Sequence, residues 1–247
     1  MSMSLQELLA LFSKETLATL YMVSISTLIS YAIGIPLGVI LVVTEEGSIA
    51  PNKIIHGILG FFTNIFRTIP FLILLVMVLP ITKALVHTTL GPKAIIPPLV
   101  IASAPYIARM VESSLKEVDS GVIEAAKSMG SNSFQIIFKV LLPEARPSLY
   151  VGAAICMTSI LSYSAMAGFV GGGGLGAIAL NYGYYRYQTD MMLIAVVVLV
   201  VGTPCMIHKS LPLTSPYIGD YEAKDTMIMV MMLSILVIWA INVLRRR

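Results

Sequence analysis

The stretch EAAKSMGSNSFQIIFKVLLP, Glu124–Pro143, lies at the centre of the one long charged loop in this chain. The rest of the sequence is mostly apolar: its 247 residues are 57% hydrophobic and only 12% charged, whereas soluble domains are typically about 25% charged. This composition is that of a polytopic membrane protein. An ordered polar loop between apolar segments predicts a docking surface for a second protein.

The apolar segments are long enough to cross a bilayer, because a span needs about 20 apolar residues at 1.5 Å each. We predict an all-α integral membrane protein with five transmembrane helices and a possible sixth apolar segment at the C-terminus. The five spans are placed near residues 17–43, 57–79, 95–111, 149–170 and 191–207.

Prolines modify two of these spans. Pro36 removes a backbone hydrogen bond in the first span and predicts a kink there. Pro97, Pro98 and Pro105 predict a short and irregular third span that neighbouring helices shield from lipid.

Basic residues set the expected orientation, because cytoplasmic loops of membrane proteins are enriched in Lys and Arg. The loop at residues 112–147, with its flanks, carries more of them than the other loops: Arg109, Lys116, Lys127, Lys139 and Arg146. We therefore predict that this loop is cytoplasmic and that the N-terminus is outside.

The long loop reads as two short helices. Asp119 or Ser120 can cap the first, and Gly130 suits the position just after its end. Ser133 can cap the second helix, and Pro143 is expected to end it. On periodicity alone, a pair of interfacial helices lying on the bilayer fits equally well.

The loop resembles a known family signature at EAA-x3-G-x9-V-x-LP, the cytoplasmic motif of ABC importer permeases. The matching residues are Glu124, Ala125, Ala126, Gly130, Val140, Leu142 and Pro143. Ile is usual at the Val140 position. Four further segments are similar to the permease subunit of methionine ABC importers: NIFRTIPFLILL (Asn64–Leu75), APYIARMVESSL (Ala104–Leu115), YSAMAG (Tyr163–Gly168) and GGGGLG (Gly171–Gly176).

The resemblance, which covers roughly residues 15–200, implies a type I permease fold in a bacterial inner membrane. Two copies would pair as a homodimer within membrane lipid, with two ATPase subunits beneath. A substrate-binding lipoprotein would deliver D- or L-methionine. The helix at Glu124–Gly130 would be the coupling helix, and the contact residues would be Glu124, Ala125, Ala126, Gly130, Leu142 and Pro143. The alternative substrate is another small molecule, such as a polar amino acid.

No catalytic role is expected for the chain itself. It lacks the GxxxxGK[ST] phosphate cradle, so ATP is expected on the partner subunit and no cofactor on this one. Gly171–Gly176 fits GxGxxG but lacks a βαβ context. We find no HExxH motif, metal-ligand cluster, intramembrane carboxylate pair or nucleic-acid-binding stripe. An integral membrane enzyme and an ATP-independent channel are the other classes considered, and neither explains the EAA loop.

Four residues are candidates for the translocation path. Arg67 lies inside the second predicted span, where a charge usually faces protein or water; snorkelling to the interface is the alternative. Met166, with Tyr163 and Ser164, could form an adaptable apolar gate in the fourth span. Plain packing is the alternative for these three.

The C-terminal part departs from the family pattern. We assign residues 1–207 to the transmembrane domain and 208–247 to an atypical extension with an apolar segment at 226–244, followed by three arginines. That segment could span the membrane, lie at its inner surface or in a dimer, or replace the inner part of the fifth span. A partial terminal duplication is also conceivable.

Overall fold

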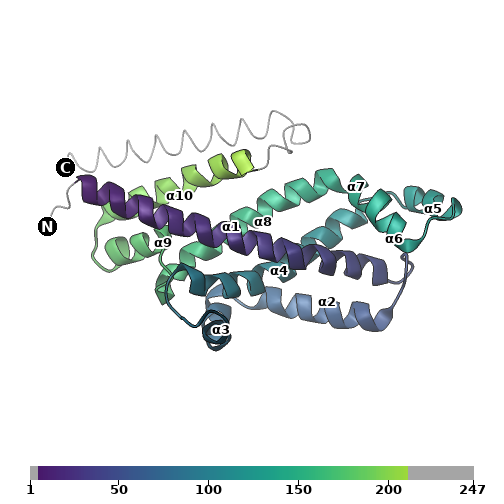
Figure 1. The fold of residues 1–247 in the computed structure, drawn as a ribbon, viewed down its shortest axis with the longest axis horizontal. Coiled ribbons are helices and arrows are strands. Elements are labelled where there is room, and N and C mark those ends of the chain that lie inside the picture. The colour runs from purple at the N-terminus through teal and green to yellow at the C-terminus, as the bar shows by residue number, and fades with distance from the viewer. Residues whose placement is uncertain (1–4, 211–247) are drawn as a thin grey trace. The chain divides into compact units, whose positions relative to one another are not determined.

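A computed structural model describes residues 5–210, and within them the chain forms helices joined by short turns (Figure 1). The prediction of an all-α protein is confirmed for this part. The helices are α1 (Leu5–Thr44), α2 (Lys53–Thr68), α3 (Phe71–Val86), α4 (Pro92–Lys116), α5 (Ser120–Ser128), α6 (Ser133–Ile136), α7 (Leu142–Glu144), α8 (Arg146–Met166), α9 (Leu175–Ile178) and α10 (Thr189–Ser210). The apolar segment at 226–244 lies outside the described residues.

Three short helical segments of other types complete the described chain. Two are π-helical, η1 (Ile137–Leu141) and η3 (Ala179–Tyr184), and η2 (Ala167–Val170) is a 3-10 helix. Each of them adjoins the end of an α-helix, where 3-10 turns are frequent, whereas π-helical turns are rare.

The described residues divide into two compact units. The second unit comprises Ser26–Leu74 and Val100–Cys156, and the first comprises the remaining described segments, 5–25, 75–99 and 157–210. Each unit draws on several helices and has its own apolar core. The core of the first unit contains Phe12, Leu175, Ile178, Met191 and Ala195. The core of the second contains Val42, Ile107, Val111, Leu115, Leu141, Ala145 and Cys156.

Three of the described helical stretches are long and apolar enough to cross a membrane: Gln6–Thr44, Pro92–Lys116 and Arg146–Val170. Counting the bent pair α2 and α3 as one span gives four. The chain is therefore a multi-pass membrane protein. The predicted count of five is not reached within the described residues, where the apolar part of α10 is the shorter stretch Thr189–Val200.

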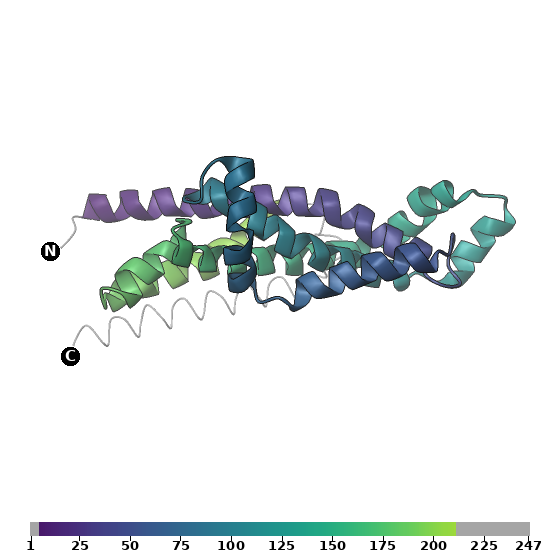
Figure 2. The same cartoon turned by 90° about the horizontal axis from the view of Figure 1, so that it is seen from below.

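The second predicted span is not one straight helix. Helices α2 and α3 meet at an angle of 111° around Ile69 and Pro70, and Figure 2 shows α3 turned across the direction of α2. Pro70 lacks an N–H and disfavours helical geometry in the residue before it. Ile69 accordingly adopts an extended conformation, with φ −75° and ψ 122°. Arg67 thus lies in the last turn of α2 and not within a continuous span.

The prediction of a short and irregular third span was wrong. Helix α4 runs without interruption for 25 residues through Pro97, Pro98 and Pro105, and α1 likewise continues through Pro36. Burial explains the regularity of α4, because 56% of its apolar 18-residue stretch is buried inside the protein. Neighbouring helices can compensate for backbone hydrogen bonds that proline removes.

Two glycines let α1 approach α4 closely within the second unit. A Cβ atom added to Gly38 would lie 2.6 Å from the carbonyl oxygen of Ala108, and one added to Gly34 would lie 2.6 Å from Cγ2 of Ile107. Small residues at helix contacts allow such close packing in membranes. These contacts hold the part of α4 that carries the charged residues described below.

Candidate functional site

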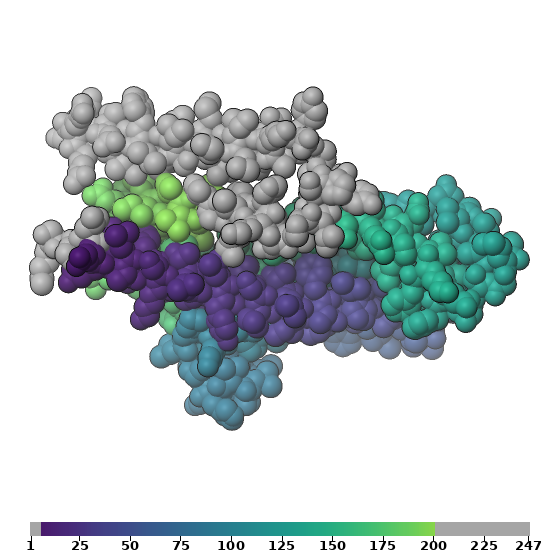
Figure 3. Space-filling model, turned by 45° about the horizontal axis from the view of Figure 1, so that its top comes forward, coloured from purple at the N-terminus to yellow at the C-terminus, as the bar shows by residue number. Residues whose placement is uncertain are grey.

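The loop lobe, residues 119–144, comprises α5, α6, η1 and α7 with their caps. It extends past the neighbouring ends of α1 and α2 in the second unit (Figures 1 and 2), and Figure 3 shows it as a protruding teal group. Helix α5 begins where the Asp119 carboxylate accepts the N–H of Gly121 at 2.6 Å. It ends before Gly130, whose φ of +80° closes the turn. Asp119, one of the two expected caps, and Gly130 are therefore confirmed.

The EAA residues divide between the two faces of α5. Glu124 and Ala125 are exposed, whereas Ala126 is buried with only 2% of its surface accessible. Ala126 thus packs α5 against the rest of the lobe, while Glu124 faces outward. Met129, at the C-cap, is 79% exposed. This arrangement leaves a charged and partly apolar surface open to a partner.

The cap of the second loop helix is Asn132, and the prediction of Ser133 was wrong. The Asn132 side chain accepts the N–H of Gln135 at 2.8 Å, and the Gln135 side chain accepts the N–H of Asn132 at 3.1 Å. This reciprocal pair is a capping box. Ser133 is instead the first residue of α6. The side chain of Asn132, one position earlier, accepts the Gln135 N–H, which has no acceptor within the helix.

Pro143 does not end the second loop helix, contrary to expectation. The helix widens into the π-helical turn η1 at Ile137–Leu141 and continues as α7 at Leu142–Glu144. Pro143 is the second residue of α7 and directly follows the π-helical turn. Leu142 and Pro143 are both half-buried. They therefore pack within the lobe and contribute less to its exposed surface.

Two aromatic residues on the lobe are unusually exposed. The rings of Phe134 and Phe138 lie 4.4 Å apart between centroids, and their exposed fractions are 68% and 54%. Phenylalanine at such exposure commonly marks an interaction surface. The i, i+4 spacing of the two residues places them on one apolar stripe of the second loop helix, but no site role was predicted for either.

A charged network on α4 was also missed. Glu112 is only 7% exposed at its side chain and bonds Arg109 Nη1 at 2.6 Å and Lys116 Nζ at 3.0 Å. Lys116 also pairs with Glu45 at 2.8 Å, just beyond the end of α1. Arg109 Nη2 donates to the Gly60 carbonyl of α2 at 3.1 Å. The network therefore ties α4 to both neighbouring helices. Charges at the i, i+3 and i+7 positions of the ARMVESSLK segment could have indicated it.

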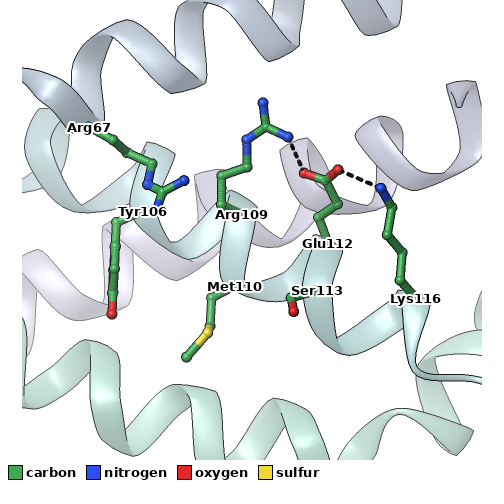
Figure 4. Close-up of a pocket in the computed structure, with 7 residues that line it drawn as sticks. All are labelled: Arg67, Tyr106, Arg109, Met110, Glu112, Ser113 and Lys116. Atoms are coloured by element: carbon green, nitrogen blue, oxygen red, sulfur yellow. Dashed lines mark hydrogen bonds and ion pairs between the residues drawn. The ribbon is translucent and has the colours of Figure 1, made fainter.

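Arg67 lies beside this network. Its guanidinium is 6.0 Å from the centroid of the Tyr106 ring, and it is exposed on the second unit. Figure 4 shows the hollow that it enters and places Tyr106 and Met110 on the same side of α4. The hollow is lined by Arg67, Tyr106, Arg109, Met110, Glu112, Ser113 and Lys116.

The candidate gate residues lie at the end of α8 in the first unit. Met166 is the last residue of α8 and is 41% exposed. Ser164 is buried, and its hydroxyl donates to the Leu161 carbonyl at 2.7 Å. Tyr163 is half-buried. Arg67 belongs to the second unit, so it forms no single described cluster with these three residues.

The glycine-rich segment that follows is held in a shape that other residues rarely adopt. Gly171, Gly173 and Gly174 have φ values of +74°, +77° and +82°, a region that favours glycine. This explains the run of glycines as a backbone turn and not as a nucleotide-binding motif. Among the described residues, no group of three or more His, Cys, Asp or Glu side chains could hold a metal ion.

The apolar helices and the EAA-type lobe define the class of this protein as a membrane-spanning transport subunit of the ABC importer type. The family model described as "Binding-protein-dependent transport system inner membrane component" matches residues 34–207, more than half of the chain. The chain belongs to that family. Membership in a family of transport components confirms the prediction of a transport subunit and not an enzyme.

Two relatives within this family carry descriptions as methionine permeases. The chain is 48% identical over 186 residues to the probable D-methionine transport system permease protein MetI of Vibrio cholerae, covering 75% of this chain and 83% of that protein. It is 47% identical over 162 residues to the methionine import system permease protein MetP of Bacillus subtilis, covering 66% and 73% respectively.

A solved structure agrees with these relatives. It shows inward-facing conformations of the MetNI methionine ABC transporter. Its matching chain is 40% identical to this one with a TM-score of 0.81, covering 87% of this chain and all of that one. The prediction of a type I permease fold is thereby confirmed at the level of fold.

Proposed function

We propose that this chain is the membrane-spanning permease subunit of an ATP-driven methionine importer in a bacterial inner membrane. The observation that carries the proposal is the 48% identity over 186 residues to a probable D-methionine permease. The alignment covers most of both chains, so it includes the membrane helices as well as the loop. The runner-up substrate, a polar amino acid, has no comparable support.

The loop lobe would be the contact with the ATPase subunit and hence the coupling lobe of the transporter. Glu124 and Ala125 face outward while Ala126 is buried, so α5 is anchored on one side and open on the other. A rigid helix of this kind can transmit ATPase closure to the membrane helices. Gly130, Leu142 and Pro143 would hold the lobe in shape. ATP would be bound and hydrolysed on the partner.

The assembly would contain two copies of this chain, two ATPase subunits and an external substrate-binding lipoprotein. The exposed apolar side chains along the helices fit contacts with lipid or a second copy. Met166, with Tyr163 and Ser164, would form the apolar constriction of the path, because a thioether side chain adapts its shape without strain.

Uptake tests the proposal directly. The chain is expressed with its genomically adjacent ATPase and binding protein in cells that lack methionine uptake, and uptake of labelled D- and L-methionine is measured. We expect energy-dependent uptake that unlabelled methionine competes and polar amino acids do not. Competition by polar amino acids with no effect of methionine would contradict the assignment of substrate.

Co-purification tests the coupling lobe. The ATPase is expected to co-elute with the wild-type chain and to be lost with Glu124→Arg, because the substitution reverses the charge on the open face of α5. Glu117→Arg is the matched control, since Glu117 is also exposed but precedes α5. Retention of the ATPase by Glu124→Arg would reject this role for α5.

A further inference from the structure

Arg67 lies well away from the charged start of α2. Two ion pairs mark that start, Lys53 with Glu46 at 2.9 Å and Lys116 with Glu45 at 2.8 Å. Helix α2 begins at Lys53, and Arg67 follows 14 positions later, at about 20 Å along the helix axis. The hydrocarbon core is about 30 Å thick. Arg67 is therefore separated from these ion pairs by a length comparable to most of that thickness.

Arg67 is a cation without a local counter-charge. Arg109 and Lys116, the other two cations of the hollow, are balanced by Glu112 and Glu45. Among residues 5–210, Arg67 has no carboxylate within ion-pair distance, and its described partner is the Tyr106 ring at 6.0 Å. That distance is at the outer limit of a cation–π contact. The hollow thus carries one uncompensated positive charge.

Membrane-embedded charges face water or protein and mark substrate pathways. A guanidinium offers a planar fork that matches a carboxylate with two parallel hydrogen bonds. The Tyr106 ring lies next to Arg67, and Met110 points to the same side of α4 as Tyr106 (Figure 4), so both add apolar surface to the lining of the hollow. A ligand with a carboxylate next to an unbranched apolar side chain fits both features. Polarizable sulfur contacts aromatic rings favourably.

We propose that Arg67, with Tyr106 and Met110, forms a transient binding subsite for the α-carboxylate of the transported amino acid. The inference rests on the proposed function and adds the residue that receives the substrate's negative charge. A single carboxylate contact does not distinguish mirror images, because chiral selection needs further fixed contacts. The subsite therefore accepts D- and L-methionine alike.

Thermal unfolding of the purified chain tests the subsite without other proteins that could bind the ligand. The full chain is purified alone in neutral detergent, and its unfolding midpoint is followed by circular dichroism. D- and L-methionine are expected to raise the midpoint by about 3 °C at ten times Kd. Methioninamide, which lacks the carboxylate, is expected to leave it unchanged. Equal shifts with methioninamide, or no shift with methionine, would overturn the proposal.

Variants locate the effect. Arg67→Gln is expected to abolish the methionine shift, and Arg67→Lys to keep at least part of it. Arg186→Gln is the matched control and keeps the full shift, because Arg186 also lies over a tyrosine, Tyr182, at 4.8 Å but in the first unit. An undiminished shift in Arg67→Gln would overturn the proposal. If that variant does not fold, the comparison of methionine with methioninamide on the wild type still decides.

A lipid phosphate is the other source of an anion for Arg67. The same measurement is repeated with phosphatidylglycerol or phosphatidylcholine added to the detergent. Stabilisation by phosphatidylglycerol that depends on Arg67, with no effect of methionine, would overturn the proposal and assign Arg67 to a lipid headgroup. The uptake assay on the wild-type complex remains separate: uptake without a midpoint shift rejects only the subsite, whereas no methionine uptake rejects the proposed function itself.

Discussion

The carboxylate of Glu15 in α1 accepts the backbone N–H of Gly174 at 2.5 Å, across 159 positions of sequence. One turn further along α1, Thr19 Oγ1 accepts the N–H of Leu175 at 2.9 Å. Both pairs lie in the first unit. The first N–H groups of a helix need acceptors, and α1 supplies them to α9. The glycine-rich turn after the Met166 end of α8 is thereby fixed in place by a distant helix.

Replacing Glu15 should loosen this turn. Glu15→Ala removes a charge-assisted hydrogen bond and leaves the Gly174 N–H without its acceptor, at a cost of about 1.5–3 kcal/mol in unfolding free energy. Glu15→Gln keeps a neutral acceptor and should lose less. The measurements are thermal stability and amide exchange at residues 171–176. Lys14→Ala, an exposed neighbour, is the control. Unchanged exchange in Glu15→Ala would show that the bond does not hold the turn.

Gly38 should not tolerate a side chain. A Cβ atom there meets the Ala108 carbonyl at 2.6 Å, and overpacking of this kind typically costs about 1–3 kcal/mol. Gly57 in α2 has no atom within 4 Å of the corresponding position. Gly57→Ala should therefore be neutral or stabilising by up to about 1 kcal/mol. Unfolding in mild detergent compares the two alanine variants, and equal effects would contradict the close approach of α1 and α4.

Asn132→Ala should fray the start of α6. The substitution removes the capping box, which typically contributes about 1 kcal/mol, so amide exchange at residues 133–136 should accelerate. Ser133→Ala should change little, because Ser133 lies inside the helix. A larger acceleration of exchange in Ser133→Ala than in Asn132→Ala would instead identify Ser133 as the cap.

Breaking the network at Glu112 should destabilise the second unit. Glu112→Gln leaves Arg109 and Lys116 without their shared carboxylate. Arg109 keeps the Gly60 carbonyl and the exposed Lys116 keeps Glu45, so the expected loss is about 1.5–3 kcal/mol, as for a hydrogen bond to a charged group. Glu45→Gln removes a side chain that is 38% exposed, for which less than about 1 kcal/mol is expected. Thermal unfolding of both variants makes the comparison. Similar small losses would mean that Glu112 is solvated.

Met166→Ala should raise ATP hydrolysis in the absence of substrate in the assembled complex. A smaller side chain at the end of α8 would leave the proposed constriction incomplete, so the coupling between the gate and the ATPase would weaken. Basal hydrolysis and uptake are measured on the reconstituted complex. Phe169→Ala is the control, since Phe169 is exposed at 55% and lies one turn beyond. Wild-type values in Met166→Ala would reject the gate.

Local sequence signals were reliable where a few neighbouring residues decide the structure. Asp119 and Gly130 bound α5 as expected, because caps act over two or three positions. The same reasoning failed for Asn132, where the competing cap was one residue away. It also failed at Pro70: the hydropathy of residues 57–79 predicted one span, but a single proline redirected the backbone between α2 and α3.

The amino-acid sequence by itself determined the all-α membrane class, the charged loop with its EAA helix and the family, because hydropathy, local caps and motif spacing are written in consecutive residues. The tertiary structure alone decided that α4 stays helical through its prolines, that Glu112 joins Arg109 to Lys116, and that Glu15 holds Gly174. Arg109 reaches Gly60 across 49 positions and Glu15 reaches Gly174 across 159. Contacts of that separation depend on how the helices pack, which no local pattern encodes.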